Sequence, residues 1–227
     1  MKLVEFPLIN LKLQLNRIAL KIGNIEIYWY AILITLAFIV ALLIYKKNDG
    51  KFEIKFADIT DLAIFIIPIS LISARLYYVV FNLNYYISNP TEIINTRSGG
   101  MAIYGGIIGG IITCFIFCKK RKIEILNLTD YLAPGLAIGQ AIGRWGNFIN
   151  VEAYGAKTNL PWRMGIYEAG TYIEVHPTFL YESIATFFIF IILMKISKNR
   201  KFKGQITYLY FIFYGFFRML IEGLRRR

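Results

Sequence analysis

Residues 27–45 read IYWYAILITLAFIVALLIY, a continuous apolar stretch without a charged side chain. Its length is close to the roughly 20 residues that an α-helix needs to cross the hydrocarbon core of a bilayer. Five further largely apolar stretches follow at 57–82, 101–118, 126–143, 178–196 and 205–222. This spacing predicts an all-α chain, a polytopic integral membrane bundle of six transmembrane helices.

The composition supports a membrane rather than water as the solvent. Of the 227 residues, 57% are hydrophobic and only 18% are charged, whereas a soluble domain of this size needs more charge on its surface. Cys114 and Cys118 lie four residues apart in one apolar stretch, so we expect buried thiols rather than a structural disulfide. No linker or repeat divides residues 1–227, which predicts a single membrane-embedded domain.

The basic residues indicate how the chain is oriented. Lys and Arg number 26 against 14 acidic residues, a net charge of +12. Segments 46–55, 119–122 and 195–203 carry 13 of these basic residues, whereas segments 83–100 and 144–177 carry four. The positive-inside rule therefore predicts that the N-terminus lies outside. No basic patch is predicted on a soluble face, so we expect no nucleic-acid partner.

Residues 1–24 contain four basic residues but neither a continuous apolar core nor a small-residue cleavage site. A removable signal peptide is therefore not expected. We predict an extracytoplasmic interfacial segment that lies along the membrane surface.

Several polar residues interrupt the apolar stretches at one depth. At a rise of about 1.5 Å per helical residue, these polar residues all lie in the outer half of the membrane. They are Tyr30, Arg75, Tyr104, Arg144, His176, Arg218 and Glu222. Buried arginines are costly unless they are paired, and guanidinium groups bind phosphate in a planar, bidentate manner. The three arginines thus predict a site for a phospholipid headgroup. Internal ion pairs, Arg144 with Glu152 or Arg218 with Glu222, are an alternative that is compatible with this site.

Glycines surround the start of the third predicted helix, at positions 99, 100, 105, 106, 109 and 110. Small residues four apart let two helices approach closely. Alternatively, residues 99–106 break the outer end of the helix and present Tyr104 to a cavity. The single histidine, His176, cannot build a metal site with other histidines and is expected to orient the start of the fifth helix. We therefore predict neither a metal nor a cofactor.

The run GRWGNFINVEAYG at 143–155 resembles the signature of the bacterial prolipoprotein diacylglyceryl transferases. Segments 28–30, 73–78, 99–106, 130–134, 176–182 and 214–225 resemble other motifs of that family in the same order. The resemblance implies transfer of the diacylglyceryl group from phosphatidylglycerol to the thiol of the lipobox cysteine in prolipoprotein signal peptides. Glycerol phosphate is released in this first step of lipoprotein maturation. It also implies a bacterial cell (inner) membrane location, with the active site toward the extracytoplasmic leaflet.

The resemblance also implies roles for individual residues. Arg144 binds the phosphate of phosphatidylglycerol, and Arg218 holds or activates the headgroup as the ester C–O bond breaks. Tyr214 and Glu222 orient Arg218. The remaining candidate substrate-binding residues are Tyr30, Arg75, Asn147, Asn150, Glu152 and Gly155, of which several fix Arg144.

Two features depart from the family pattern. Tyr104 stands where many members carry a histidine that is proposed to deprotonate the cysteine. A phenol with pKa near 10 is a weak base for a thiol with pKa near 8.5, so we expect the field of Arg144 and Arg218 to activate the thiol, with Tyr104 hydrogen-bonding the substrate. His176 is an alternative base. The family also continues beyond the Arg218 helix, and its seventh helix is not found in this sequence.

Two other functions are weighed against catalysis. The first is an inactive relative that binds lipid or precursor peptide. The second is a transporter for an anionic solute, which would need a polar path on both sides of the midplane. The inner halves of the predicted helices are almost entirely Ile, Leu, Phe and Val, which argues against such a path.

Overall fold

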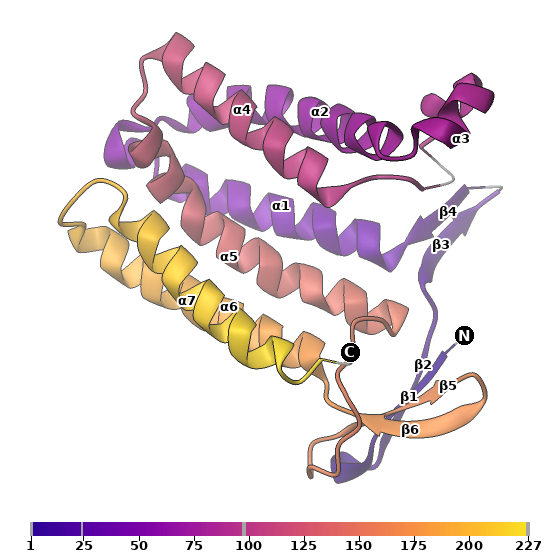
Figure 1. Cartoon of the computed structure of the whole chain (residues 1–227). Helices are drawn as coiled ribbons and strands as arrows, with labels where there is room; N and C mark the ends of the chain where they lie inside the picture. The colour runs from indigo at the N-terminus through magenta and orange to yellow at the C-terminus, as the bar shows by residue number, and fades with distance from the viewer. Residues whose placement is uncertain (1, 24, 97–98, 226–227) are drawn as a thin grey trace. The chain divides into compact units, whose positions relative to one another are not determined.

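A computed structural model describes residues 2–23, 25–96 and 99–225 of the chain. They form two compact units, one of Met1–Lys47 with Thr129–Arg227 and the other of Asn48–Leu128. Figure 1 traces the elements of each unit along the chain. The first unit contains most of the predicted site residues, and the second contains Arg75 and Tyr104.

Helices dominate both units. The α-helices are α1 (Trp29–Lys47), α2 (Phe56–Val80), α3 (Leu83–Ser88), α4 (Ile103–Arg121), α5 (Ile125–Asn150), α6 (Thr178–Ile196) and α7 (Gln205–Glu222). The strands are β1 (Lys2–Phe6), β2 (Leu11–Leu15), β3 (Ile18–Ile22), β4 (Ile25–Tyr28), β5 (Met164–Glu168) and β6 (Thr171–Val175). Short 3₁₀ turns occupy Pro7–Ile9, Lys51–Glu53, Pro90–Ile93 and Ser197–Asn199.

Each of the six apolar stretches forms a long helix, namely α1, α2, α4, α5, α6 and α7. Within the described residues, four helical stretches are long and apolar enough to cross a membrane: Trp29–Lys47, Lys51–Val80, Ile103–Arg121 and Thr178–Asn199. The other two, α5 and α7, are interrupted by polar residues of the predicted site, among them Arg144 on α5 and Arg218 and Glu222 on α7. The chain is therefore a polytopic membrane protein with four clear candidate spans.

The expectation of an all-α chain is wrong outside these helices. Four antiparallel strands form a sheet in the order β2-β1-β5-β6, and β3 pairs with β4 in a separate hairpin. The sequence LKLQL of β2 alternates apolar and polar side chains, which is the period of a half-buried strand rather than of a helix. Because the mean hydropathy of the whole chain is high, this local alternation of apolar and polar residues is easily overlooked in the sequence.

The N-terminal segment is part of this sheet. Val4 is fully buried and pairs with Ile166 of β5. Together with Met164 and Val175 it forms one core with Phe148 at the end of α5 and Phe179 at the start of α6. The sheet therefore fixes the ends of the two helices that carry Arg144 and Glu182 (Figure 1).

Glycines and a buried carboxylate pack the helices of the first unit. A Cβ at Gly146 of α5 would meet the ring of Tyr30 from α1 at 2.5 Å, so this glycine makes room for the tyrosine. Near the other end of α5, the fully buried Asp130 accepts hydrogen bonds from Arg200 Nη1 (3.0 Å), Gly204 N (2.8 Å) and Thr207 N (2.9 Å). These bonds hold the first turn of α7 against α5.

In the second unit, α2 and α4 pack closely through small residues. A Cβ at Gly105 or Gly109 would overlap atoms of Ser73 on α2, which confirms the close-packing interpretation of the glycines. Gly99 and Gly100 have φ of 93° and 77°, a conformation that glycine adopts without steric cost. They lie before the helix, and α4 runs from Ile103 through Gly105 and Gly106, so the chain departs from helical geometry at Gly99 and Gly100 only, and the predicted cavity at Tyr104 stays a prediction.

Candidate active site

Glu182 of α6 lies between the two arginines that the sequence analysis singled out. Its Oε2 lies 2.5 Å from Arg144 Nη2 of α5 and 3.0 Å from Arg218 Nη1 of α7. Glu182 is only 4% exposed. One carboxylate oxygen therefore joins three helices and is shared by two positive charges.

The arginine of α7 has a second acidic partner. Arg218 Nη2 lies 2.5 Å from Glu222 Oε2, which confirms the predicted ion pair four residues apart on one helix. Glu222 in turn lies 3.4 Å from Arg225 Nη1. Arg144 forms its ion pair with Glu182 and not with Glu152, because Glu152 is held by amides instead.

The signature residues after Arg144 form a hydrogen-bonded shell around it. Arg144 Nη1 donates to Asn147 Oδ1 at 3.4 Å. Asn147 Nδ2 donates to Glu152 Oε1 at 2.9 Å, and Asn150 Nδ2 donates to the same oxygen at 3.3 Å. Glu152 thus acts on Arg144 through Asn147, which fixes the amide orientation that the arginine needs.

Gly155 positions the end of α7. Its amide donates to His176 O at 2.9 Å, and the adjacent Ala156 N donates to Leu224 O at 2.8 Å. A Cβ at Gly155 would lie 2.6 Å from Leu224 O and 2.7 Å from His176 Cβ. The contact that the structure gives to Gly155 is therefore with the backbone after Arg218.

His176 lies directly before α6. Its Nδ1 is 3.3 Å from the hydroxyl of Tyr181, which also accepts a hydrogen bond from Trp162 Nε1 at 2.8 Å. Burial lowers the pKa of His176 below its ordinary 6.5, so its imidazole is neutral at physiological pH. These contacts agree with an orienting role at the start of α6.

Tyr214 and Arg218 line a small cavity beside Glu182. Its volume of about 10 Å³ is close to what one water molecule needs. Glu182 Oε1 accepts no hydrogen bond from the residues that the structure describes. A buried acceptor therefore lies next to the two guanidinium groups, beside a space that fits about one water molecule.

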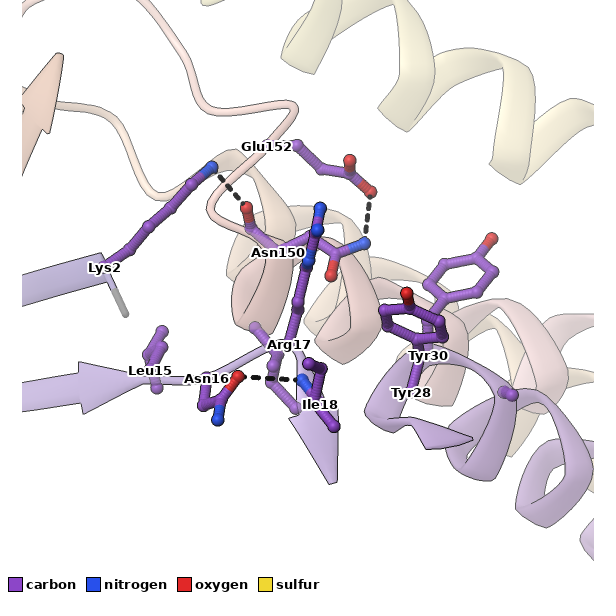
Figure 2. Close-up of a pocket in the computed structure, with 11 residues that line it drawn as sticks. Lys2, Leu15, Asn16, Arg17, Ile18, Tyr28, Tyr30, Asn150 and Glu152 are labelled. Carbon is purple, nitrogen blue, oxygen red and sulfur yellow. Dashed lines mark hydrogen bonds between the residues drawn. The ribbon is translucent and has the colours of Figure 1, made fainter. Parts of the chain in front are cut away.

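A larger groove lies beside the signature residues (Figure 2). Its volume is about 830 Å³. The polar residues that line it include Lys2, Asn16, Arg17, Tyr30, Asn150 and Glu152, and we call it the N-terminal groove. Tyr30, Asn150 and Glu152, three predicted substrate-binding residues, thus meet at one surface of the first unit.

Arg75 has a different environment from the other two arginines. It is 6% exposed, and all five of its N–H donors are directed at backbone carbonyls. Those carbonyls belong to Glu92, Ile93, Asn95, Gly99 and Gly100, at 2.5–2.9 Å. Contacts within the chain therefore account for its burial, contrary to the argument that buried arginines here require a phosphate.

Tyr104 lies in the first turn of α4 and is 68% exposed. It belongs to the unit Asn48–Leu128, as Arg75 does, whereas Arg144 and Arg218 belong to the other unit. The structure therefore gives it an accessible hydroxyl next to the glycine loop, and its part in the reaction stays a prediction.

Glu182 is not among the predicted site residues, although it lies in the motif at 176–182. The signal was available, because an acidic residue within the apolar stretch 178–196 is a functional candidate by default at membrane depth. Lys2 and Arg17 were likewise treated only as surface charges, since nothing in the sequence reveals that the N-terminal strands reach the signature residues.

Comparison with known proteins agrees with these motifs. The profile described as prolipoprotein diacylglyceryl transferase matches residues 17–227. A phosphatidylglycerol–prolipoprotein diacylglyceryl transferase of Finegoldia magna is 49% identical over 212 residues, covering 93% of this chain and 84% of the relative. The proteins of the same name from Clostridioides difficile and Bacillus cereus are 48% and 39% identical, over 93% of this chain and 84% and 82% of their own lengths.

Both the extent of these matches and the order of the motifs lead to one assignment. The matched residues include the Arg144, Glu182 and Arg218 network as well as the glycine loop before α4. The chain belongs to the prolipoprotein diacylglyceryl transferase family of bacterial multi-pass membrane proteins.

Proposed function

We propose that this protein transfers the diacylglyceryl group of phosphatidylglycerol to the thiol of the lipobox cysteine in a prolipoprotein signal peptide. The cysteine sulfur attacks the glycerol carbon that carries the phosphate ester. As the new C–S bond forms, the C–O bond breaks and its electron pair leaves with the phosphate as glycerol phosphate. The observation that carries the proposal is the pair of arginines, Arg144 and Arg218, that converge on Glu182.

This pair supplies what the departing phosphate requires. Three guanidinium groups, those of Arg144, Arg218 and Arg225, pair with only two carboxylates, Glu182 and Glu222, so the network has one excess positive charge that an anionic headgroup can neutralise. Arginine keeps its charge at any physiological pH, and fixed charge placed where negative charge develops is a large source of rate acceleration. Arg144 binds the phosphate, and Arg218 stabilises it as the ester bond breaks.

The surrounding residues position the two arginines. Glu182 and Glu222 hold Arg218, and Tyr214 lines the cavity beside it. Asn147, oriented by Glu152, steadies Arg144. Tyr30 and Asn150 face the N-terminal groove and contact the hydroxyl groups of the headgroup (Figure 2). Gly155 keeps the end of α7 in place through the backbone at Leu224.

The thiol must lose its proton before or during attack. The positive field of Arg144 and Arg218 lowers the pKa of a bound cysteine by favouring its thiolate, and the proton passes to solvent. Tyr104 hydrogen-bonds the substrate through its accessible hydroxyl. Arg75 serves this step indirectly, since it holds the carbonyls of Gly99 and Gly100 before α4.

We also propose a membrane topology for the chain. The six long helices all cross the bacterial cell membrane, with the N-terminus outside and the basic segments 46–55, 119–122 and 195–203 in the cytoplasm. The strands β1, β2 and β3 then lie at the extracytoplasmic surface. In this orientation Arg144 and Arg218 face the outer leaflet, where phosphatidylglycerol and the signal peptide are both accessible.

The direct test is a transfer assay. The purified chain in detergent is incubated with phosphatidylglycerol and a lipobox peptide, and the peptide cysteine is examined by mass spectrometry. We expect a diacylglyceryl mass increase, and a rate about 100-fold lower for Arg144→Ala. The matched control is Arg121→Ala, which removes an exposed arginine that pairs with Asp61 and should leave the rate unchanged. Absence of transfer, or equal rates for Arg144→Ala and the wild type, would refute the proposal.

A further inference from the structure

The N-terminal groove joins residues of two kinds within one compact unit (Figure 2). Tyr30, Asn150 and Glu152 belong to segments that the family profile matches. Lys2 and Asn16 precede residue 17, where that match begins. The strands before α1 therefore add a wall to the site that the family motifs do not predict.

That wall carries two cationic groups. Lys2 Nζ donates one hydrogen bond to Asn150 O at 2.8 Å, and its ammonium has further donors. The Arg17 guanidinium lies 5.8 Å from the centre of the Tyr28 ring and forms no ion pair with the residues that the structure describes. Figure 2 shows its side chain directed toward Asn150. The groove thus presents a guanidinium whose donors are available to a ligand.

The opposite wall supplies acceptors. Glu152 is fixed because its Oε1 accepts hydrogen bonds from Asn147 at 2.9 Å and Asn150 at 3.3 Å, and a carboxylate retains further acceptor positions. A ligand with an anionic end and a hydroxylated end matches this distribution, since phosphate pairs with guanidinium and ammonium groups while hydroxyls donate to the carboxylate.

We propose that the N-terminal groove is a second phosphate subsite that binds a glycerol phosphate group through Arg17 and Lys2, with its hydroxyls on Glu152. The inference rests on the proposed function, because that reaction supplies this group both as the lipid headgroup and as the released product. The subsite is distinct from Arg144 and Arg218 but is linked to them, since Glu152 contacts Asn147 and Asn147 contacts Arg144. The volume of about 830 Å³ admits the group with its hydration.

Direct binding tests the subsite without requiring catalysis. Radiolabelled glycerol phosphate is dialysed to equilibrium against the full chain in maltoside micelles at low salt, in the Arg144→Ala background so that the first phosphate site is disabled. We expect saturable binding that Arg17→Gln weakens about 10-fold, as the loss of charge-assisted hydrogen bonds predicts. The control is Lys21→Gln, which removes a cation of the same N-terminal region that pairs with Glu26 outside the groove, and it should change binding less than about twofold.

A second measurement distinguishes the two sources of the group. Micelles doped with phosphatidylglycerol compete with the labelled ligand if the groove receives the lipid headgroup, and they do not compete if it receives the released product. The proposal is overturned if Arg17→Gln and Lys21→Gln bind glycerol phosphate equally, or if no saturable binding occurs. Binding without transfer by the wild type would refute only the proposed function, whereas transfer without groove binding would refute only the subsite.

Discussion

Arg75, which is buried, and the pair Arg144 and Arg218, which are partly exposed, are arginines of one sequence that have opposite surroundings. All five N–H donors of the Arg75 guanidinium group hydrogen-bond to backbone carbonyls of residues between Glu92 and Gly100. Arg144 and Arg218 have side chains that are 23% and 29% exposed, and their partners are carboxylates. The first arginine has no donor left for a ligand, while the other two keep accessible donors beside a shared acid.

The difference separates a structural arginine from arginines that can bind substrate. Carbonyl partners are fixed parts of the chain, and breaking five hydrogen bonds to bind a phosphate would unfold the loop before α4. Arg144, Arg218 and Arg225 share two carboxylates, so one positive charge remains for an incoming phosphate to neutralise. Variants at five positions test this difference between the structural arginine and the substrate-binding arginines.

The largest effect is expected at Arg218. Arg218→Ala should slow diacylglyceryl transfer about 100- to 1,000-fold, because a fixed charge at the departing phosphate is lost. Arg218→Lys should recover only part of the rate, since an ammonium lacks the planar, bidentate geometry of a guanidinium. The transfer assay with a lipobox peptide measures both variants, and a full rate for Arg218→Ala would remove this residue from the site.

Arg75 should affect stability instead. Arg75→Ala leaves buried carbonyls without donors, and we expect the free energy of unfolding to fall by about 3 kcal/mol. Thermal unfolding in detergent, followed by tryptophan fluorescence, reports the loss. The rate per folded molecule should stay within about threefold of the wild type, and a loss of rate as large as that of Arg218→Ala would contradict the structural role.

Glu182 connects the two substrate-binding arginines. Glu182→Gln preserves the side-chain shape but removes the charge that holds both guanidinium groups, and we expect transfer to slow about 10-fold. The matched control is Glu222→Gln, which releases Arg218 and Arg225 but leaves Arg144 paired, and it should have the smaller effect. If Glu222→Gln proves the more damaging of the two, Glu182 is not the centre of the network.

Gly155 tests whether the placement of α7 matters. Gly155→Ala puts a methyl group 2.6 Å from Leu224 O, so the end of α7 must shift, at a cost of about 1–3 kcal/mol. We expect transfer to slow about fivefold, because Arg218 moves with the helix. The control is Gly139→Ala in α5, where the added methyl group meets no atom within 4 Å, and it should leave the rate unchanged.

The smallest effect is expected at Tyr104. Tyr104→Phe removes one hydrogen bond to the substrate, which corresponds to about a threefold loss of rate. The KM for the lipobox peptide and the turnover number are measured separately. An unchanged rate would show that this hydroxyl has no direct role. A loss of about 100-fold would instead show that Tyr104 is the group that activates the thiol.

The sequence predicted the helices well because its strongest signal is local. Runs such as 178–196 and 205–222 coincide with α6 and α7, since burial in a bilayer demands continuous apolar stretches of fixed length. The strands were missed because β1 and β2 are short and lie in the amphipathic segment 1–24. Of the two partners of β1, β5 is more than 150 residues away along the chain, and no local pattern reports such a pairing.

The site was predicted in part for the same reason. The motif positions Arg144, Asn147, Glu152 and Arg218 could be recognised because each is a polar residue in an apolar or signature context. The Arg218 and Glu222 pair follows from helical spacing alone. The choice of Glu182 rather than Glu152 as the partner of Arg144 could not be read, because it depends on how α5, α6 and α7 pack.

By itself the sequence determined that this chain folds in a membrane, the approximate positions of its long helices, and to which family of enzymes it belongs. These properties follow from composition, periodicity and motifs, all of which act over a few turns of helix. Only the tertiary structure decided which arginines have N–H donors accessible to a ligand. The hydrogen-bond partners of a guanidinium group are carbonyls and carboxylates that come from distant segments of the chain. It also brought Lys2 and Arg17 beside Asn150, a juxtaposition that exists only once the N-terminal strands pair with β5.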